Sequence, residues 1–392
     1  MKILDLLEKT IDNRGRTPPV TDDGYCLLEI NCIAGKDKYP DYSLVKKHVT
    51  AETYNSWFRS GHPQKGDILI PTVGTLDAVS MMDRDDCCIA QNLVAFRSNP
   101  KICDCDFLYY LLCDPTVRTR VLQLDIGAVQ PSIKVPHLKN LEVEIPDLDK
   151  QKKIARILNI LDKKIAINKK VNENLEQQAA SCFYHQFIVN TSPSWRAGTI
   201  SDLGTVVGGG TPSKAKAEYY TDNGIAWITP KDLSTDKSKF IAHGTNDITE
   251  LGLRNSSATI MPAGTVLFSS RAPIGYIAIA DGEVSTNQGF KSIIPFNNVG
   301  TAFVYFFLKN ALPTIENMAS GSTFKEISGS AMGIVPALIP DNDSLHEFSI
   351  FCEPLFKQQR MLEAENRSLA ALRDALLPHL MSGELDVSNL NI

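Results

Sequence analysis

The stretch Val206–Ala217, VVGGGTPSKAKA, contains the residue types of a phosphate-binding loop: three glycines followed by hydroxyl and lysine side chains. A nucleotide-binding P-loop places its lysine directly after the last glycine, where the ammonium group reaches the phosphates. Here a Thr-Pro-Ser tripeptide separates Gly210 from Lys214, and its proline removes a backbone N–H that such a loop needs as a donor. A nucleotide-using enzyme built on Gly208–Gly210 therefore remains only as an alternative.

Other catalytic and metal-binding patterns are missing from the sequence. It contains no H-E-x-x-H or G-x-S-x-G motif, and neither Thr17–Val20 nor Ser98–Lys101 fits the [DNS]-P-P-[YFW] loop of DNA amino-methyltransferases. The nine cysteines include no C-x-x-C pair, and the C-D-C at Cys103–Cys105 has no second pair at zinc-ligand spacing. We therefore expect free thiols, no metal, no cofactor and no catalytic residues, which favours a recognition protein over an enzyme.

The overall composition is that of an ordinary soluble protein. The 392 residues suit two or three domains, and 43% of them are apolar and 22% charged. No segment approaches the roughly 18 consecutive apolar residues that predict a membrane span. The charged, amphipathic start lacks the features of a secretory signal. We expect a cytoplasmic protein with no membrane partner.

The glycine-rich stretch has an earlier counterpart. G-R-T-P-P at Gly15–Pro19 matches G-G-T-P-S at Gly209–Ser213, an offset of 194 residues. Five further pairs of segments occur in the same order at offsets of 194 to 200, among them Gly127–Asp147 with Gly321–Asp341. Each match is weak, but their common order indicates a duplicated domain.

Each copy has the pattern of a mixed α+β domain. Short apolar runs predict strands within residues 66–72 and 264–270, and an alternating segment predicts a hairpin that turns at Asp281-Gly282. Helical patterns follow late in both copies, at residues 107–124 and 303–319. The Gly-Thr-Pro stretch is then a turn entering the sheet, in which the glycines supply positive φ angles.

A long helix is expected after each copy. From Lys150, a stretch of about 37 residues without Gly or Pro carries recurring apolar residues, at Ile154, Leu158, Leu161, Ile165, Ile167, Val171 and Leu175. After Asp343, a second tract steps by three and four residues, the heptad spacing of a coiled coil, through Phe348, Phe351, Leu355, Gln358, Leu362, Glu365, Leu369, Leu372 and Leu376. Pro354 is expected to delay or kink this second helix.

The two helical tracts carry opposite charge. Residues 149–195 contain eight Lys and Arg against four Asp and Glu, whereas residues 341–392 contain four against nine. Because a globular copy separates them in sequence, we expect them to pair antiparallel as a coiled-coil stalk; the alternative is that each packs on its own domain. The expected α+β fold thus has globular domains at residues 1–148 and 190–340, a connecting helix at 149–189, and the second helix and C-terminal tail at 341–392.

The order of these features resembles the specificity subunit of type I restriction–modification systems. The resemblance is carried by P-x-x-x-x-Q-x-x-I-A, at Pro146, Gln151, Ile154 and Ala155, and by LLPHLMSGEL, at Leu376–Leu385. It implies two target recognition domains that each read half of a split double-stranded DNA sequence. It also implies helices that set the spacing and bind two methyltransferase subunits, which a restriction/translocase subunit joins, and no catalytic residues in the chain itself. Ile339–Pro354 departs from the pattern, since it lacks the Gln-x-x-Ile-Ala form.

If the chain binds DNA as the resemblance implies, polar loop residues beside the sheets are the expected contacts. Lys and Arg neutralise phosphates, while Arg, Lys, Asn, Gln and Ser read base edges. The candidates for DNA contact are Arg14, Arg16, Lys65, Gln130 and Lys134 in the first copy, and Lys214, Lys216, Lys231, Ser269, Arg271 and Lys325 in the second. The candidates for methyltransferase contact are Gln151, Ile154, Leu158 and Leu161. Four amides at matching positions have two interpretations, base reading or satisfaction of buried backbone groups: Gln91, Asn92, Asn287 and Gln288.

The charge balance keeps a second alternative open. The whole chain has a net charge of −5, and neither globular copy has an excess of basic residues. A structural adaptor with two binding modules that never meets DNA would have the same balance.

Overall fold

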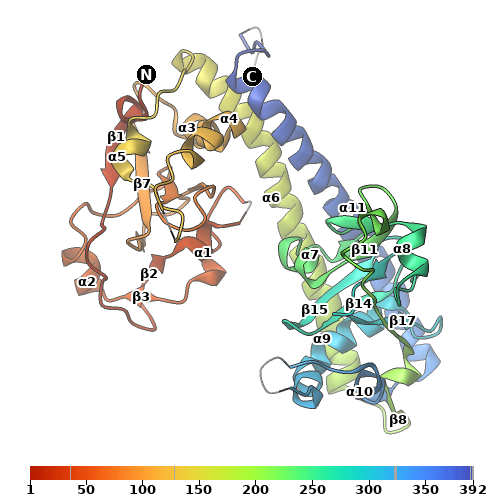
Figure 1. Ribbon diagram of the computed structural model, residues 1–392. Coiled ribbons are helices and arrows are strands. Elements are labelled where there is room, and N and C mark those ends of the chain that lie inside the picture. Colours follow the sequence, from red (N-terminus) through yellow and green to blue (C-terminus); the bar gives the residue numbers. More distant parts are fainter. Residues whose placement is uncertain (36, 128, 322–324, 389, 391–392) are drawn as a thin grey trace. The chain divides into compact units, whose positions relative to one another are not determined.

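The computed structural model describes residues 1–35, 37–127, 129–321, 325–388 and 390. The chain divides into two compact units, the first formed by Met1–Ala166 with Arg367–Ile392 and the second by Ile167–Asn366. The two longest helices, α6 (Leu148–Tyr184) and α11 (Asn342–Met381), each contribute one part to either unit (Figure 1).

The first unit is built on an antiparallel sheet in the order β1-β7-β4-β5. The four residues of β4 are all apolar and all buried, which suits an inner position. A second sheet pairs β2 antiparallel with β3 and parallel with β6. The strands are β1 (Leu7–Ile11), β2 (Tyr25–Leu28), β3 (His48–Val49), β4 (Ile68–Pro71), β5 (Ser80–Met81), β6 (Cys87–Ile89) and β7 (Leu93–Ser98). The helices are η1 (Ile3–Leu6), α1 (Ile30–Ile33), η2 (Tyr42–Leu44), α2 (Ala51–Ser56), α3 (Cys105–Cys113), α4 (Pro115–Leu122) and α5 (Val135–Lys139).

The second unit repeats this topology. The order β9-β17-β14-β15 matches β1-β7-β4-β5, and β12 adds an outer strand beside β15. Strand β11 pairs antiparallel with β13 and parallel with β16, as β2 does with β3 and β6. The shared order confirms a duplicated α+β domain.

The elements of the second unit have the following bounds. Its strands are β8 (Arg196–Thr199), β9 (Gly204–Gly208), β10 (Tyr220–Thr221), β11 (Ile225–Ile228), β12 (Phe240–Ile241), β13 (Asn246–Ile248), β14 (Val266–Ser270), β15 (Ile274–Ala280), β16 (Ser285–Thr286), β17 (Lys291–Pro295) and β18 (Pro336–Ile339). Its shorter helices are η3 (His185–Val189), η4 (Ile200–Asp202), η5 (Ala217–Tyr219), α7 (Pro230–Thr235), α8 (Glu250–Arg254), α9 (Thr301–Met318) and α10 (Gly329–Gly333).

The hairpin predicted at Asp281-Gly282 is wrong. Strand β15, which ends just before this turn, pairs antiparallel with the preceding strand β14. Strand β16, which follows the turn, pairs with β11 instead. The Asp-Gly sequence therefore connects two sheets, because local turn chemistry does not decide which strand lies beside which.

The glycine-rich stretch is a site of close packing and not of unusual backbone angles. Gly15 has a φ of 110°, but Gly208, Gly209 and Gly210 have no positive φ. A Cβ atom on Gly209 would lie 2.0 Å from the carbonyl oxygen of Asn287, so backbone there approaches backbone directly. The predicted reason for these glycines is thus wrong for the second copy, and close packing replaces it.

The two long helices are present, and contacts inside each unit make them antiparallel (Figure 1). Helix α11 begins at Asn342, well before Pro354, so the expected delay at the proline is wrong. Three polar contacts join the helices: Arg373 Nη1 to Asp162 Oδ1 at 2.7 Å, Asn168 Nδ2 to Asn366 Oδ1 at 2.9 Å, and Gln359 Nε2 to the carbonyl oxygen of Asn172 at 3.1 Å. Residue numbers fall along α6 as they rise along α11.

The predicted heptad register of α11 is correct at only every second position. Phe348 and Leu362 are buried as expected, but Phe351 and Leu372 are 42% and 48% exposed. The contact seam instead includes three polar residues spaced seven apart, Gln359, Asn366 and Arg373. An apolar pattern misses such positions, and polar seam residues are a known means of specifying the register of a coiled coil.

The cysteine prediction is confirmed, since all nine cysteines carry free thiols. Burial raises the pKa of Cys103 and of Cys352 to about 12, so both remain protonated at neutral pH. In the described part of the chain, no helix combines the length and apolar character that a membrane crossing requires. Among the same residues, no group of three or more His, Cys, Asp or Glu is arranged to hold a metal ion.

The polar seam makes a stability prediction. Arg373→Met removes the cationic partner of Asp162, whose side chain is only 11% exposed, and should lower the free energy of unfolding by about 3 kcal/mol. The neighbouring Leu372→Ala removes an exposed side chain and should cost less than about 1 kcal/mol. Denaturant unfolding of the two variants measures the difference; equal losses would show that the seam does not pass through Arg373.

Candidate nucleic-acid interface

Three loops of the first unit meet at the carboxyl end of β4. The contacts that hold them together are Thr72 N–H to the carbonyl of Asn92 at 2.8 Å, Ile133 N–H to the carbonyl of Thr72 at 2.9 Å, and a side-chain hydrogen bond from Gln91 to Thr17. The loops that carry Arg16, Gln91 and Gln130 therefore converge. We call this surface, residues 14–17, 73–75, 91–92 and 130–133, the first loop edge.

The second unit builds the same surface from matching residues. The corresponding contacts are Ser270 N–H to the carbonyl of Gly289 at 2.7 Å, Ile327 N–H to the carbonyl of Ser270 at 3.1 Å, and a side-chain hydrogen bond from Thr211 to Gln288. In both units the threonine of the G-x-T-P sequence thus bonds a glutamine on a neighbouring loop. Residues 209–216, 271–273, 287–289, 291 and 325–327 form the second loop edge.

The second loop edge holds two cations on one carboxylate. Arg271 Nη1 lies 3.3 Å from Glu326 Oε2, and Lys291 Nζ lies 3.8 Å from Glu326 Oε1. The Arg271 and Glu326 side chains are 36% and 37% exposed, so solvent and ligands reach the pair. Lys325, beside Glu326, is also exposed. A phosphate can replace the carboxylate here, because guanidinium and ammonium groups bind both anions in the same way.

Some of the predicted DNA contacts have partners within the chain. Arg14 forms a 2.6 Å ion pair with Asp12. The guanidinium of Arg16 lies 4.2 Å from the centre of the Trp57 ring, and Lys216 donates to the hydroxyl of Tyr219 at 3.0 Å. Five further candidates are exposed lysines that have no such side-chain partner among the described residues: Lys65, Lys134, Lys214, Lys231 and Lys325.

Four predicted positions lie outside the loop edges. Lys134 directly follows the first loop edge, and Lys231 lies in α7. Lys65 is exposed but precedes β4, at the opposite end of that strand from Thr72. The prediction that Ser269 contacts DNA is wrong, because its side chain is fully buried. Its hydroxyl donates to the carbonyl of Pro273 at 2.9 Å and accepts from the N–H of Tyr276 at 2.8 Å, so it stabilises the turn beside Arg271.

The amides with two interpretations have different contacts in the structure. Gln91 and Gln288 bond the loop-edge threonines with exposed or half-exposed side chains. Asn287 accepts from the N–H of Gly289 at 2.8 Å and therefore shapes its own loop. Two polar residues of this surface, Lys291 and Glu326, were not predicted from the sequence. Glu326 is adjacent to the predicted Lys325, and Lys291 lies in a strand that the repeat duplicates, so both features could have indicated them.

The α6 side chains predicted to contact a methyltransferase mostly make contacts inside the first unit. The Gln151 amide accepts from the N–H of Asp104 at 3.0 Å and donates to the carbonyl of Ile102 at 3.1 Å. Ile154 and Leu158 are 4% and 0% exposed in the core of that unit. Their predicted role in binding a partner is replaced by a structural one, and Leu161 is half-buried. Apolar α6 side chains that do face solvent include Ile160 and Ile167, 55% and 58% exposed.

The duplicated topology, with one loop edge in each unit and a shared pair of long helices, defines a two-module recognition protein. Residues 35–177 and 194–359 match the family described as type I restriction modification DNA specificity domain. The chain therefore belongs to the type I restriction–modification DNA specificity family.

Individual relatives agree with this assignment. The type I restriction enzyme HindI specificity subunit of Haemophilus influenzae is 23% identical over 402 residues, which cover 82% of this chain and 87% of the relative. The MjaIX specificity subunit of Methanocaldococcus jannaschii is 38% identical over 178 residues, but the match spans only 43% of this chain and 41% of that protein. The crystal structure of the type I restriction–modification S subunit from M. genitalium has the same fold, with a TM-score of 0.56 at 18% identity over 97% of this chain and 95% of that one.

The cation pair of the second loop edge makes a binding prediction. Glu326→Gln removes the internal anion that holds Arg271 and Lys291, so DNA affinity should rise, and the slope of log affinity against log salt should steepen by about one. Glu250→Gln is the matched control, because it removes the same charge from an exposed pair with Arg254 on α8. Fluorescence anisotropy of the chain co-purified with its methyltransferase subunits measures both. An identical change in the two variants would assign the effect to net charge and not to the loop edge.

Proposed function

We propose that this chain is the DNA sequence-recognition subunit of a type I restriction–modification complex. Residues 1–148 and 190–340 act as target recognition domains, and each contacts one half of a split site in double-stranded DNA. The helical tracts at residues 149–189 and 341–392 fix the separation of the halves and bind methyltransferase subunits.

The observation that carries this proposal is the repetition of the loop edge on a repeated topology. In both units a side-chain hydrogen bond joins the threonine of the G-x-T-P sequence to a glutamine, Thr17 with Gln91 and Thr211 with Gln288. Exposed polar side chains held in place by a rigid sheet suit readout of a duplex, where phosphate contacts position the protein and base-edge contacts select the sequence. Two such surfaces in one chain suit a bipartite target.

The chemistry in this proposal belongs to the partners. Methyltransferase subunits, two for each chain because the chain has two units, transfer the methyl group, and a restriction/translocase subunit joins the same complex. The chain itself is non-catalytic and uses no cofactor. It acts in the cytoplasm, where the DNA lies.

The surface for the methyltransferase subunits is on the solvent side of the helices. Ile160, Ile167 and Val171 follow one face of α6 and are 55%, 58% and 38% exposed. On α11, Ile350 and Met361 are 57% and 58% exposed. Apolar side chains in this number on an otherwise polar helix pair favour burial against another protein.

A domain exchange tests the proposal. Residues 1–148 are replaced with the matching segment of a relative, and the chimera is expressed with its methyltransferase genes in cells without other DNA methylation. Methylome sequencing should show one half of the methylated sequence changed and the other half retained, because each unit reads alone. Simultaneous change of both halves would contradict separate readers, and a full complex with neither DNA binding nor methylation would favour the adaptor alternative.

A further inference from the structure

Among the described residues, each unit contains one buried lysine, and the two lie at the same place in the repeat. Lys38 and Lys239 are each 7% exposed. The carbonyl of Lys38 accepts from the N–H of Met81 at 2.7 Å, and that of Lys239 accepts from the N–H of Ile279 at 2.7 Å. Met81 lies in β5 and Ile279 in β15, which hold the same position in the two sheets. The lysines are therefore structural equivalents, although neither belongs to a loop edge.

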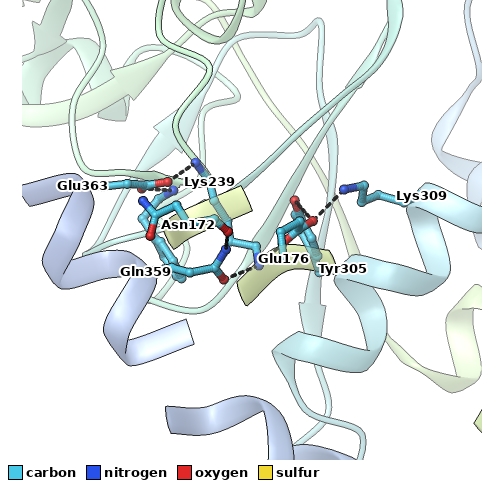
Figure 2. Close-up of polar contacts among 8 residues, drawn as sticks. Asn172, Glu176, Lys239, Tyr305, Lys309, Gln359 and Glu363 are labelled. Atoms are coloured by element: carbon cyan, nitrogen blue, oxygen red, sulfur yellow. Dashed lines mark hydrogen bonds and ion pairs between the residues drawn. The ribbon is translucent and has the colours of Figure 1, made fainter. Parts of the chain in front are cut away.

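In the second unit the lysine bridges the globular part to both long helices (Figure 2). Lys239 Nζ lies 2.5 Å from Glu176 Oε2 on α6 and 2.8 Å from Gln359 Oε1 on α11. The same ammonium lies 3.6 Å from the centre of the Phe356 ring, also on α11. Two helices thus supply a carboxylate, an amide and an aromatic face to one charge.

The two carboxylates of this cluster have further partners. Glu176 also accepts from Lys309 at 2.6 Å and from the Tyr305 hydroxyl at 3.2 Å, both on α9. Burial favours a raised pKa for Glu176, but Lys239 and Lys309 outweigh it and hold the pKa below its usual value, so the group is ionised. Glu363 of α11 accepts the backbone N–H groups of Lys239 and Phe240 at 2.9 and 3.0 Å (Figure 2). These two hydrogen bonds join the start of the edge strand β12 to α11.

In the first unit the same lysine is held differently. Lys38 Nζ lies 2.5 Å from Asp106 Oδ1 on α3, within its own globular part, and 4.8 Å from the centre of the Tyr110 ring. Its contact with α6 is a hydrogen bond to the neutral amide of Asn159. The Tyr110 hydroxyl adds a 2.5 Å hydrogen bond to Asp162 of α6. The carboxylate partner of the lysine is thus on the long helix in the second unit only.

The physical consequence is control of orientation more than of stability. A buried ion pair is often no more stabilising than apolar residues of the same size, but removing one partner or misplacing it leaves an unpaired buried charge. Apolar contacts such as that of Phe356 tolerate a small shift of the sheet along the helix, whereas a hydrogen bond between charged groups does not. The lysine therefore excludes neighbouring orientations of each globular part on its helices.

We propose that Lys38 and Lys239 are positioning residues that fix each globular part in one orientation on the helices, and so restrict the complex to one gap between the half-sites. This inference rests on the proposed function. Lys239 carries the larger share, because its carboxylate partner Glu176 is on the long helix itself.

The test measures the methylation rates of the complete complex on three duplexes. They carry the native half-sites with the native gap and with one base pair more or fewer. The preference for the native gap is the ratio of the rate on the native duplex to the rate on an altered duplex, measured with one preparation. A variant that yields less folded complex lowers both rates equally and leaves this ratio unchanged. Lys239→Met should reduce this preference roughly tenfold, the factor that one hydrogen bond to a charged group is worth. Glu176→Gln should reduce it in the same direction while keeping a hydrogen-bonding side chain.

The matched control is Arg97→Met. Arg97 of β7 forms a 2.8 Å ion pair with Asp67, whose side chain is 2% exposed and which directly precedes β4 in the first globular part. The side-chain hydrogen bonds of Arg97 go to Asp67 and not to the long helices. This variant loses a buried ion pair but should keep the gap preference of the wild type within about twofold. A wild-type preference that persists unchanged in both Lys239→Met and Glu176→Gln would overturn the inference. A wild-type complex that methylates all gaps equally would instead refute the proposed function.

Discussion

The structure depends on the antiparallel pairing of α6 and α11. Each helix contributes to both units, so the atoms that fix their register also fix which residues each globular part meets. Polar side chains set that register: Arg373 meets Asp162 in the first unit, and Asn366 meets Asn168 in the second. Sliding one helix by a turn would leave these groups buried and unpaired, which is far more costly than moving leucines along an apolar stripe. A defined register is what a chain needs if its two binding surfaces are to act on one rigid ligand.

Each globular part then uses its fold in the same way. A sheet positions the loop edge of each unit, and a buried lysine that hydrogen-bonds β5 or β15, Lys38 or Lys239, contacts the long helices. The residues proposed to contact DNA and the lysines proposed to hold each globular part on the helices are thus different residues. The loop edges differ in chemistry, since among the described residues an Arg–Glu–Lys cluster occurs in the second and not in the first, while a buried lysine stands at the same position in both units. Variable surfaces on a constant frame are consistent with readers of different sequences.

The sequence allowed prediction of the duplication, the α+β class and both long helices, because these are expressed in segment order, in periodicity and, for the first helix, in the absence of Gly and Pro. It did not allow prediction of the contacts that pair the helices, since the decisive α11 positions, Gln359 and Arg373, are polar and break the apolar pattern. Ser269 illustrates the same limit: a hydroxyl in a strand reads as a surface group until tertiary packing buries it. The hairpin prediction at Asp281-Gly282 was wrong because pairing between Trp227 and Ser285, 58 residues apart, overrode a local turn signal.

The most direct test of the account lengthens both helices together. One heptad is inserted between Ala166 and Ile167 and one between Asn366 and Arg367, at the boundaries of the two units, so that the seam keeps its phase. Seven residues extend a helix by about 10 Å, and B-DNA rises about 3.4 Å per base pair, so the gap should grow by about three base pairs. Methylome sequencing of cells that express the lengthened chain reads the gap directly. The account predicts unchanged half-sites with a longer gap; methylation at the original gap would contradict the claim that the paired helices set it.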